Sequence, residues 1–369
     1  MKQYDIGLDL GTTSIIIATQ EQGVVFHQPS IGAVDTRSST ILAVGDKALR
    51  MVGRVPSYID IIRPLRDGII QDHRMTNELI VRFINEVCRS RIIKPRVSVC
   101  VPAAITGIEA DAVVEAVMAA GARQVFLVDE PVAAALGAGL DIRKPMGCMV
   151  IDIGGGSTDI AVISMGGRVR AASLPVAGNA FDQCIAQYVQ EKFNIAIGAL
   201  TKTAERYYSY MFRYEALEAE NEALKKQVAC CTKSEFEGVM EIRGHSWETN
   251  LPARRLVYTR DLYLPVQELA ARIAATARNV LESTPPELAA DVAKNGILLT
   301  GGGSMLRGLA GYIAGELHVD VAIAPDPINC VARGTAASLT LGQYLTAGFR
   351  DATPRAWHNR LQSPEGFSN

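Results

Sequence analysis

The sequence lacks several features that would assign it at once to a class. No stretch approaches eighteen consecutive apolar residues, which excludes a membrane-spanning helix, and no G-x-x-x-x-G-K-[ST] motif is present, which excludes a P-loop. The seven cysteines show no C-x-x-C spacing, and an odd number without zinc spacing predicts reduced thiols in a cytosol. The formal net charge is only −2, so we expect no nucleic-acid partner. The features of a signal peptide are also missing, and we therefore expect a cytoplasmic protein.

The composition is typical of a globular protein with two domains. Of the 369 residues, 48% are hydrophobic and 21% are charged, which is enough apolar material for substantial cores. Strands and helices alternate along the chain, with a strand at 97–102, a helix at about 106–120 and a strand at 125–128. This order predicts an α/β fold with a mostly parallel sheet.

A glycine-rich turn stands at the centre of the chain. Two apolar runs, 149–153 and 160–163, read as a buried hairpin whose turn contains Gly154, Gly155, Gly156, Ser157 and Thr158. Glycine-rich hairpin turns usually bind nothing. Three glycines nevertheless exceed what a tight turn needs, and turn chemistry does not explain Asp152 at the end of the first strand. Because glycines let backbone N–H groups converge on an anion, we interpret this turn as a phosphate site.

The same plan occurs at the start of the chain. A strand ends at Asp9, and a glycine and three hydroxyl residues follow before the next strand: Gly11, Thr12, Thr13 and Ser14. A third glycine turn, Gly301–Ser304, follows the strand at 297–300 and leads into a helix expected from about Met305. Together the turns predict a nucleotide held between two domains, with Asp9 and Asp152 holding Mg²⁺ through its waters.

Glu130 is the best candidate for orienting the nucleophile in phosphoryl transfer. It lies just past the strand at 125–128, at the edge of an α/β sheet where such sites form. A carboxylate in the first turn of a helix is also common for structural reasons, and the two roles are compatible.

Residues 201–229 are typical of one long helix. Three-four spacing places Tyr214, Leu217, Asn221, Leu224 and Val228 on one face, with Glu220 and Lys225 where flanking charges would pair across two helices. Two heptads are too few for a self-sufficient coiled coil, which favours a helix packed on its own domain.

With these residues assembled, the chain resembles the MreB family of bacterial actins, within the actin, sugar-kinase and heat-shock ATPase superfamily. The resemblance covers roughly residues 3–345 through ordered segments that include IGLDLGTTS, VFLVDEPVAAALGAGL, MVIDIGGGSTDIAVIS and NGILLTGGGSMLRGL. It implies an actin-like fold of two domains, each with a mixed sheet flanked by helices, and ATP with Mg²⁺ in the cleft between them.

The resemblance also implies roles for particular residues. Glu130 corresponds to the glutamate implicated in hydrolysis, with Asp9 and Asp152 beside it. The nucleoside end would be formed by two groups of residues: Glu205, Arg206 and Tyr208 in the family's E-R-x-K motif, and Gly302, Gly303, Ser304 and Met305 on the other wall. Tyr208 and Tyr210 replace the usual Lys and Glu, Asn179 a usual Asp, and Asp129 a usual Glu. These departures, with an inserted segment at 209–232, favour a divergent paralogue.

The implied function is a weak ATPase that polymerises into membrane-associated filaments and organises cell-wall synthesis and cell shape. Its partners would be copies of itself, the inner face of the cell membrane, and elongation proteins of the MreC and RodZ type. Three alternatives are a small-molecule kinase of the same superfamily, a chaperone ATPase, and a nucleotide-bound scaffold that acts through the inserted helix with little hydrolysis.

A membrane contact is expected at Ile92 and Ile93, which four cations flank: Arg89, Arg91, Lys94 and Arg96. Basic residues around exposed apolar side chains favour an anionic bilayer, although isoleucines folded back onto the core would give the same pattern. In some members of the family an apolar pair at this place contacts the membrane, which favours the first interpretation.

The expected boundaries follow from these segments. We expect domain I at 1–144 plus 329–345, with a small subdomain at about 33–70. We expect domain II at 145–328, with a small subdomain at about 181–252. Residues 346–369 lose periodicity and are expected to form a disordered tail.

Overall fold

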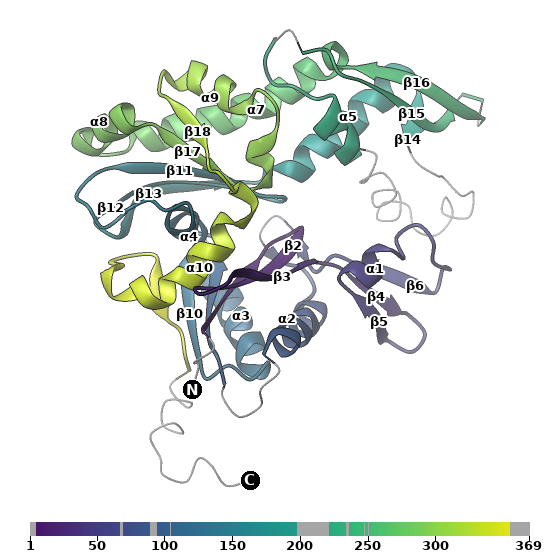
Figure 1. Ribbon diagram of the computed structural model, residues 1–369. Coiled ribbons are helices and arrows are strands. Elements are labelled where there is room, and N and C mark those ends of the chain that lie inside the picture. Colours follow the sequence, from purple (N-terminus) through teal and green to yellow (C-terminus); the bar gives the residue numbers. More distant parts are fainter. Residues whose placement is uncertain are drawn as a thin grey trace.

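A computed structural model describes residues 5–66, 69–88, 94–103, 105–197, 221–233, 236–246, 248–249 and 251–354. Two large sheets, each with its own core, make up most of the molecule (Figure 1). No helix in these ranges combines the length and the hydropathy that a membrane span requires.

The first sheet has the strand order β19-β10-β9-β1-β2-β3. Its strands are β1 (Asp5–Leu10), β2 (Ser14–Thr19), β3 (Gly23–Pro29), β9 (Arg96–Val101), β10 (Gln124–Asp129) and β19 (Phe349–Asp351). The central strands β1, β9 and β10 are parallel, so helices must return the chain between them: α2 (His73–Val87) and α3 (Gly107–Ala119). We call this sheet, these helices and the small sheet β4–β6 the first lobe.

Helix α2 shows why these segments fold as they do. Its apolar residues recur at three-four spacing, so Leu79, Phe83 and their neighbours form one buried face against the sheet. Asp72 caps its N-terminus by accepting from the backbone N–H of Met75 at 2.8 Å. Burying each large apolar side chain contributes about 1.5–3 kcal/mol.

The second sheet has the order β13-β12-β11-β17-β18. Its strands are β11 (Cys148–Ile153), β12 (Thr158–Ser164), β13 (Gly167–Leu174), β17 (Ile297–Thr300) and β18 (Val321–Ile323). The helices around it are α5 (Gly178–Phe193), α7 (Thr259–Glu282), α8 (Pro286–Asn295) and α9 (Leu309–Leu317). We call this sheet, these helices and the small sheet β14–β16 the second lobe.

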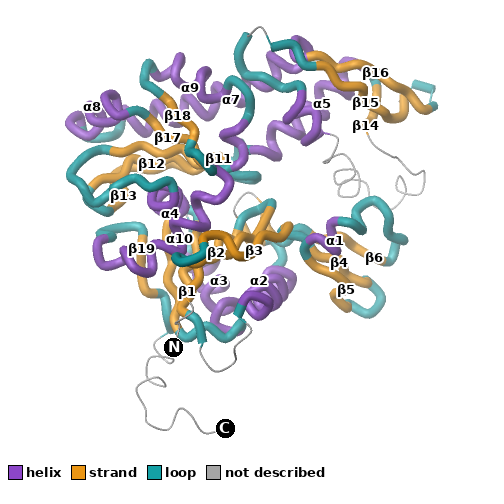
Figure 2. The backbone as a smooth tube through the Cα atoms, viewed as in Figure 1, coloured by secondary structure: helices purple, strands orange, loops and turns teal. Residues whose placement is uncertain are grey.

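Each lobe carries a small sheet on the same side of the molecule (Figure 2). One comprises β4 (Gly32–Asp35), β5 (Thr40–Val44) and β6 (Ile59–Ile62) beside α1 (Asp46–Leu49). The other comprises β14 (Ile195–Ile197), β15 (Val239–Ser246) and β16 (Pro252–Tyr258). A short hairpin, β7 (Leu65–Arg66) with β8 (Ile69–Ile70), precedes α2.

Two helices lie between the large sheets, α4 (Glu130–Gly137) and α10 (Cys330–Leu341) (Figure 1). They cross at Gly137 and Gly334, where a Cβ atom would lie only 1.7 Å from a carbonyl oxygen of the other helix. One apolar cluster joins α4 to both lobes, since it contains Val128 of β10 and Val150 of β11. The lobes are therefore connected by packed helices.

Two expectations need correction, and a third agrees with the structure. Residues 346–354 are not a disordered tail, because β19 pairs antiparallel with β10; residues 355–369 lie outside the described ranges. No α-helix starts at Met305: a 3-10 helix spans Gly302–Met305, and α9 begins at Leu309. Leu224 and Val228 are fully buried in the core of the second lobe, so the described part of the expected 201–229 helix packs on its own domain.

Candidate functional site

The two Asp–Gly turns have the same geometry. In the first turn the backbone N–H of Gly11 donates to the carbonyl of Ser14 at 3.1 Å, and in the second that of Gly154 donates to Ser157 at 3.0 Å. Each turn joins two antiparallel strands, β1 to β2 and β11 to β12, which confirms the predicted hairpin. The two halves of the chain thus present equivalent turns, two residues after Asp9 and Asp152.

The second turn is also joined to the start of α5. The N–H groups of Gly178 and Asn179 donate to the carbonyls of Gly154 and Gly155 at 3.0 and 2.8 Å. These bonds hold the N-terminus of a helix beside a turn rich in glycine. Since helix N-termini carry a partial positive charge, this arrangement suits an anion.

The two turns touch across the lobes. A Cβ atom on Gly155 would lie 1.7 Å from Oγ1 of Thr13, so any larger residue would displace this hydroxyl. The first turn needs glycine too, because a Cβ on Gly11 would lie 2.8 Å from the Ser14 carbonyl. The predicted phosphate residues of the two halves, Gly11–Ser14 and Gly154–Thr158, are therefore brought together.

The two strand-end aspartates lie close to each other, Asp152 buried and Asp9 half-buried. Burial raises the pKa of Asp9 to about 6, and the Cys100 thiol, which donates to its Oδ1 at 3.3 Å, opposes this only in part. Burial likewise raises the pKa of Asp152 to about 7, although Thr300 Oγ1 donates to its Oδ1 at 2.6 Å. The charge of Asp9 contributes to the raised pKa of Asp152. A cation beside the two carboxylates would relieve this cost.

Glu130 lies in the same group. It is the first residue of α4, directly after β10, and the Cys100 thiol lies 3.9 Å from its Oε1. Burial, followed by the charges of Asp159 and Asp152, raises its pKa well above the usual range. Glu130 is thus placed beside both aspartates, and their charges together with burial favour its protonated form.

Asp159 is a site residue that the sequence interpretation missed. Burial raises its pKa, and the neighbouring Glu130 side chain acts in the opposite direction. The signal in the sequence was a carboxylate within the apolar run of β12. All seven positions of this strand are buried in the structure, so none offers a solvent face for a carboxylate. A charged residue inside such a strand indicates a partner or a functional role.

The third turn packs under the second one. Gly301 has φ +77°, and a Cβ there would lie 2.3 Å from the carbonyl of Ile153, which only glycine tolerates. The Ser304 hydroxyl is buried and donates to the Gly301 carbonyl at 2.6 Å. Ser304 therefore holds the turn, whereas Met305 is 59% exposed beside it. Gly302 and Gly303 begin the 3-10 helix.

The residues expected at the nucleoside end are only partly described. Glu205, Arg206 and Tyr208 lie outside the described residues. Lys225 was expected to pair across two helices, and its Nζ lies 2.6 Å from Asp182 Oδ2 on α5 and donates to the Gly178 carbonyl at 3.1 Å.

Gly178 is hydrogen-bonded to the second turn, so the helical residues 221–227 bring a half-buried ammonium group beside that turn. The sequence contained a signal for this placement, because Lys225 directly follows Leu224 on the buried face of the helix.

The expected membrane contact is only partly described. Ile92 and Ile93 lie outside the described residues. Of the flanking cations, Arg96 forms an ion pair with Asp5 across β9 and β1, so it serves the fold. Lys94 is exposed.

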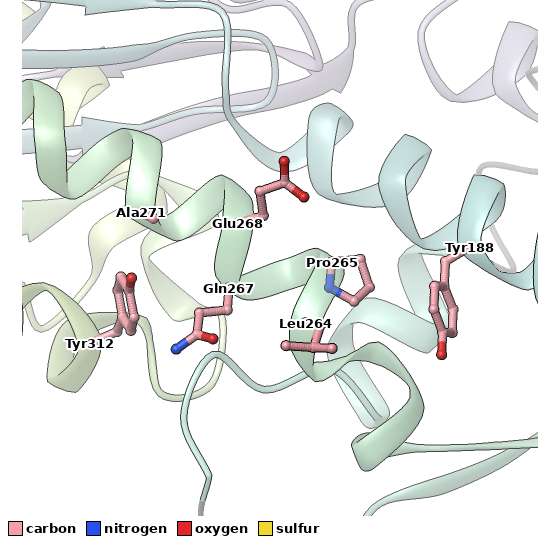
Figure 3. Close-up of a pocket in the computed structure, with 7 residues that line it drawn as sticks. All are labelled: Tyr188, Leu264, Pro265, Gln267, Glu268, Ala271 and Tyr312. Carbon is pink, nitrogen blue, oxygen red and sulfur yellow. The ribbon is translucent and has the colours of Figure 1, made fainter.

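A separate groove of about 600 Å³ lies on the second lobe, between α5, α7 and α9 (Figure 3). Tyr188, Leu264 and Tyr312 are among its lining residues, and none of the glycine turns contributes to it. Pro265 lies inside α7, and its ring nitrogen cannot donate a backbone hydrogen bond to the helix. The carbonyl of Pro265 accepts from the Cys184 thiol.

Comparisons with known proteins agree with this geometry. A family model described as MreB/Mbl protein matches residues 3–345. The cell shape-determining protein Mbl of Bacillus cereus is 41% identical over 336 residues, which are 91% of this chain and 95% of Mbl. The cell shape-determining protein MreB of Escherichia coli is 36% identical over 347 residues, 92% and 94% of the two chains.

One protein of known structure is similar throughout. The crystal structure of MreB5 of Spiroplasma citri bound to ADP superposes with a TM-score of 0.83 at 31% identity, covering 93% of this chain and 98% of that one. A second structure of the same protein is bound to AMPPNP. The expected actin-like fold is therefore confirmed.

Proposed function

The chain belongs to the MreB/Mbl protein family, and on that premise we propose that it is a bacterial actin that binds ATP with Mg²⁺ between its lobes and assembles with itself into filaments. The observation that carries the proposal is the contact of two equivalent turns, with Thr13 of one lobe against Gly155 of the other. Such turns present backbone N–H groups to an anion from both sides.

The residues present fit a nucleotide with a divalent cation. Thr12, Thr13 and Ser14 would hold the phosphates from the first lobe, and Gly154–Thr158 would hold them from the second. The structures of MreB5 of Spiroplasma citri bound to ADP and AMPPNP support an adenine nucleotide.

No cluster of three or more His, Cys, Asp or Glu side chains suited to hold a metal occurs in the described ranges. Mg²⁺ would therefore keep most of its waters, with Asp9 and Asp152 as acceptors. When bound, Mg²⁺ and its waters would neutralise the phosphate charge.

Slow hydrolysis would depend on Glu130. An ionised carboxylate at this place would accept a hydrogen bond from the attacking water and orient it. The raised pKa of Glu130 opposes ionisation, and this is consistent with a slow rate.

The same observation favours a second candidate function, a nucleotide-bound scaffold that hardly hydrolyses ATP. The raised pKa of Glu130 favours its protonated form, and in that form the side chain could not accept the proton of the attacking water. The second candidate differs from the first only in the rate of phosphate release.

The cellular role that we propose is cell-shape determination, as in the names of the Mbl and MreB relatives. The filaments would lie at the cytoplasmic face of the cell membrane, held by Ile92 and Ile93. They would organise cell-wall synthesis with partners of the MreC and RodZ type.

Light scattering tests the assembly. We expect polymer with Mg-ATP and none without nucleotide, and equal scattering in both conditions would contradict nucleotide-dependent assembly.

Phosphate release separates the two candidates: Glu130→Ala should abolish it while ATP stays bound. If Glu130→Ala releases no phosphate and the native chain releases no more than this variant, the protein is the nucleotide-bound scaffold. If Glu130→Ala still releases phosphate, a residue other than Glu130 orients the attacking water.

A further inference from the structure

Asp129, the residue directly before Glu130, is held by the opposite lobe. Its Oδ2 lies 2.8 Å from Nη1 of Arg168, on the edge strand β13 of the second lobe. The same nitrogen donates to the carbonyl of Ala103 at 2.9 Å, in the segment that follows β9. One guanidinium of the second lobe therefore contacts the ends of two neighbouring strands of the first lobe.

A small groove marks the place where the two lobes meet here. Its volume is about 270 Å³, and it is lined by Ala103 on one side and by residues 168–173 of β13 on the other. Arg168 is thus the side chain that reaches across between β13 and the first sheet. Its side chain is 33% exposed and that of Asp129 only 16%. An ion pair so far withdrawn from water is screened less than a surface pair, and removing one partner leaves a partly buried charge without compensation.

The backbone of Asp129 is fixed from another direction. Its N–H donates to the carbonyl of Gly348 at 2.8 Å, directly before β19. Gly348 has φ +80°, and a Cβ there would lie 2.9 Å from Asp129 Oδ2. Phe349 then stacks on Phe126 of β10, with ring centroids 5.4 Å apart. This strand follows residue 345, where the family match ends.

Electrostatics agree with the contacts. Burial raises the pKa of Asp129, whereas the positive charges of Arg168 and of Arg350 on β19 lower it. Two cations, one from the second lobe and one from the C-terminal strand, therefore favour the ionised side chain that the ion pair requires.

We propose that Arg168 is a positioning residue for ATP hydrolysis: by pairing with Asp129 across the lobes, it holds the first turn of α4, and with it Glu130, against the second glycine turn. Only one peptide bond separates Asp129 from Glu130, so a shift of Asp129 moves the carboxylate that faces the water. β19 supports the same residue from behind. The inference rests on the proposed role of Glu130 in hydrolysis.

Neighbouring arginines on β13 provide a matched pair of variants. Arg168→Met removes the charge that crosses the lobes. Arg170→Met removes the same charge two residues further on, where the side chain, among the residues that the structure describes, donates to the carbonyls of Val169 and Ser283, both on the second lobe. Arg168→Lys keeps the charge. Phosphate release in single turnover and the Kd for Mg-ATP are measured on the full chain for each variant.

We expect Arg168→Met to slow phosphate release at least tenfold while the Kd for Mg-ATP changes less than twofold. Arg170→Met should behave as the native chain, and Arg168→Lys should recover most of the rate. In an Asp129→Asn background, Arg168→Met should cause no further loss, because the pair is already broken. Arg168→Gln, which removes the charge but keeps a donor for Ala103, should show the same loss, and it decides the result if the Met variant unfolds.

Native phosphate release in Arg168→Met, or equal losses in Arg168→Met and Arg170→Met, would overturn the inference. Glu130→Ala, measured alongside, keeps this result separate from the proposed function. If Glu130→Ala abolishes release and Arg168→Met does not change it, only the positioning role fails. If Glu130→Ala leaves release unchanged, the role of Glu130 fails, and the positioning role fails with it.

Discussion

Replacing Asp152 by Asn tests the main electrostatic feature of the site, a carboxylate buried beside other carboxylates. The side chain is 6% exposed, and burial raises its pKa from 3.8 to about 7. Between these two values the folded chain binds more protons than the unfolded chain. The free energy of unfolding of the ligand-free protein therefore falls as the pH rises from about 4 to about 7, and it levels off above.

The magnitude follows from the size of the shift. A shift of about three pKa units at 1.36 kcal/mol per unit corresponds to about 4 kcal/mol at pH 8, of which about 2 kcal/mol is already lost at pH 5. Asn has nearly the same shape, and its carbonyl oxygen can accept the hydrogen bond of Thr300. Asp152→Asn should therefore stabilise the ligand-free protein by up to about 4 kcal/mol at pH 8 and by about 2 kcal/mol at pH 5.

Urea unfolding in EDTA without nucleotide, at both pH values, measures this difference. Asp111→Asn, which makes the same change at an exposed position of α3, is the control and should alter the free energy of unfolding by less than about 0.5 kcal/mol. With Mg-ATP added, the order should reverse, since the native chain gains stability from the ligand and Asp152→Asn gains much less. Asp152→Asn that destabilises the ligand-free protein at pH 8, or changes it equally at both pH values, would refute the reasoning.

Three further predictions concern binding. Gly155→Ala should weaken Mg-ATP binding at least tenfold by calorimetry, because the new methyl group would meet Thr13. Gly107→Ala is the control and should not weaken binding, since a Cβ atom at Gly107 has no neighbour within 4 Å. Tight binding by both variants would contradict the contact between Gly155 and Thr13. Lys225→Met should weaken binding several-fold, whereas Lys226→Met, in an exposed pair with Glu222, should leave it unchanged. Ile92→Ser with Ile93→Ser should abolish co-sedimentation with anionic liposomes and keep nucleotide binding; unchanged sedimentation argues against the membrane contact.

Much of the fold and of the phosphate end could be predicted from the sequence, because their determinants are local. In both turns an aspartate is the penultimate residue of a strand and the glycine two residues later closes the turn, so Asp9 with Gly11 and Asp152 with Gly154 are recognisable from spacing alone. Glu130 follows a buried strand in the same way. Hydrophobic periodicity likewise predicts α2 and the strand–helix alternation.

Two of the failures have one physical cause, which is that the partner lies far away in the chain. The spacing around Lys225 is equally compatible with a helix pair, and only the tertiary structure brings its ammonium group to Asp182. The segment after residue 345 has too few residues to show a period, yet it becomes a strand because the edge of β10 offers unpaired backbone groups.

The sequence by itself determined the elements, the two equivalent turns and the carboxylates that follow strands, since strand period, glycine conformation and burial act over a few residues. The tertiary structure alone decided which groups meet across the lobes: Thr13 with Gly155, Asp129 with Arg168, and Glu130 with Asp159. These contacts depend on how α4 and α10 pack the two sheets together, and close packing between distant segments leaves no local pattern in the chain.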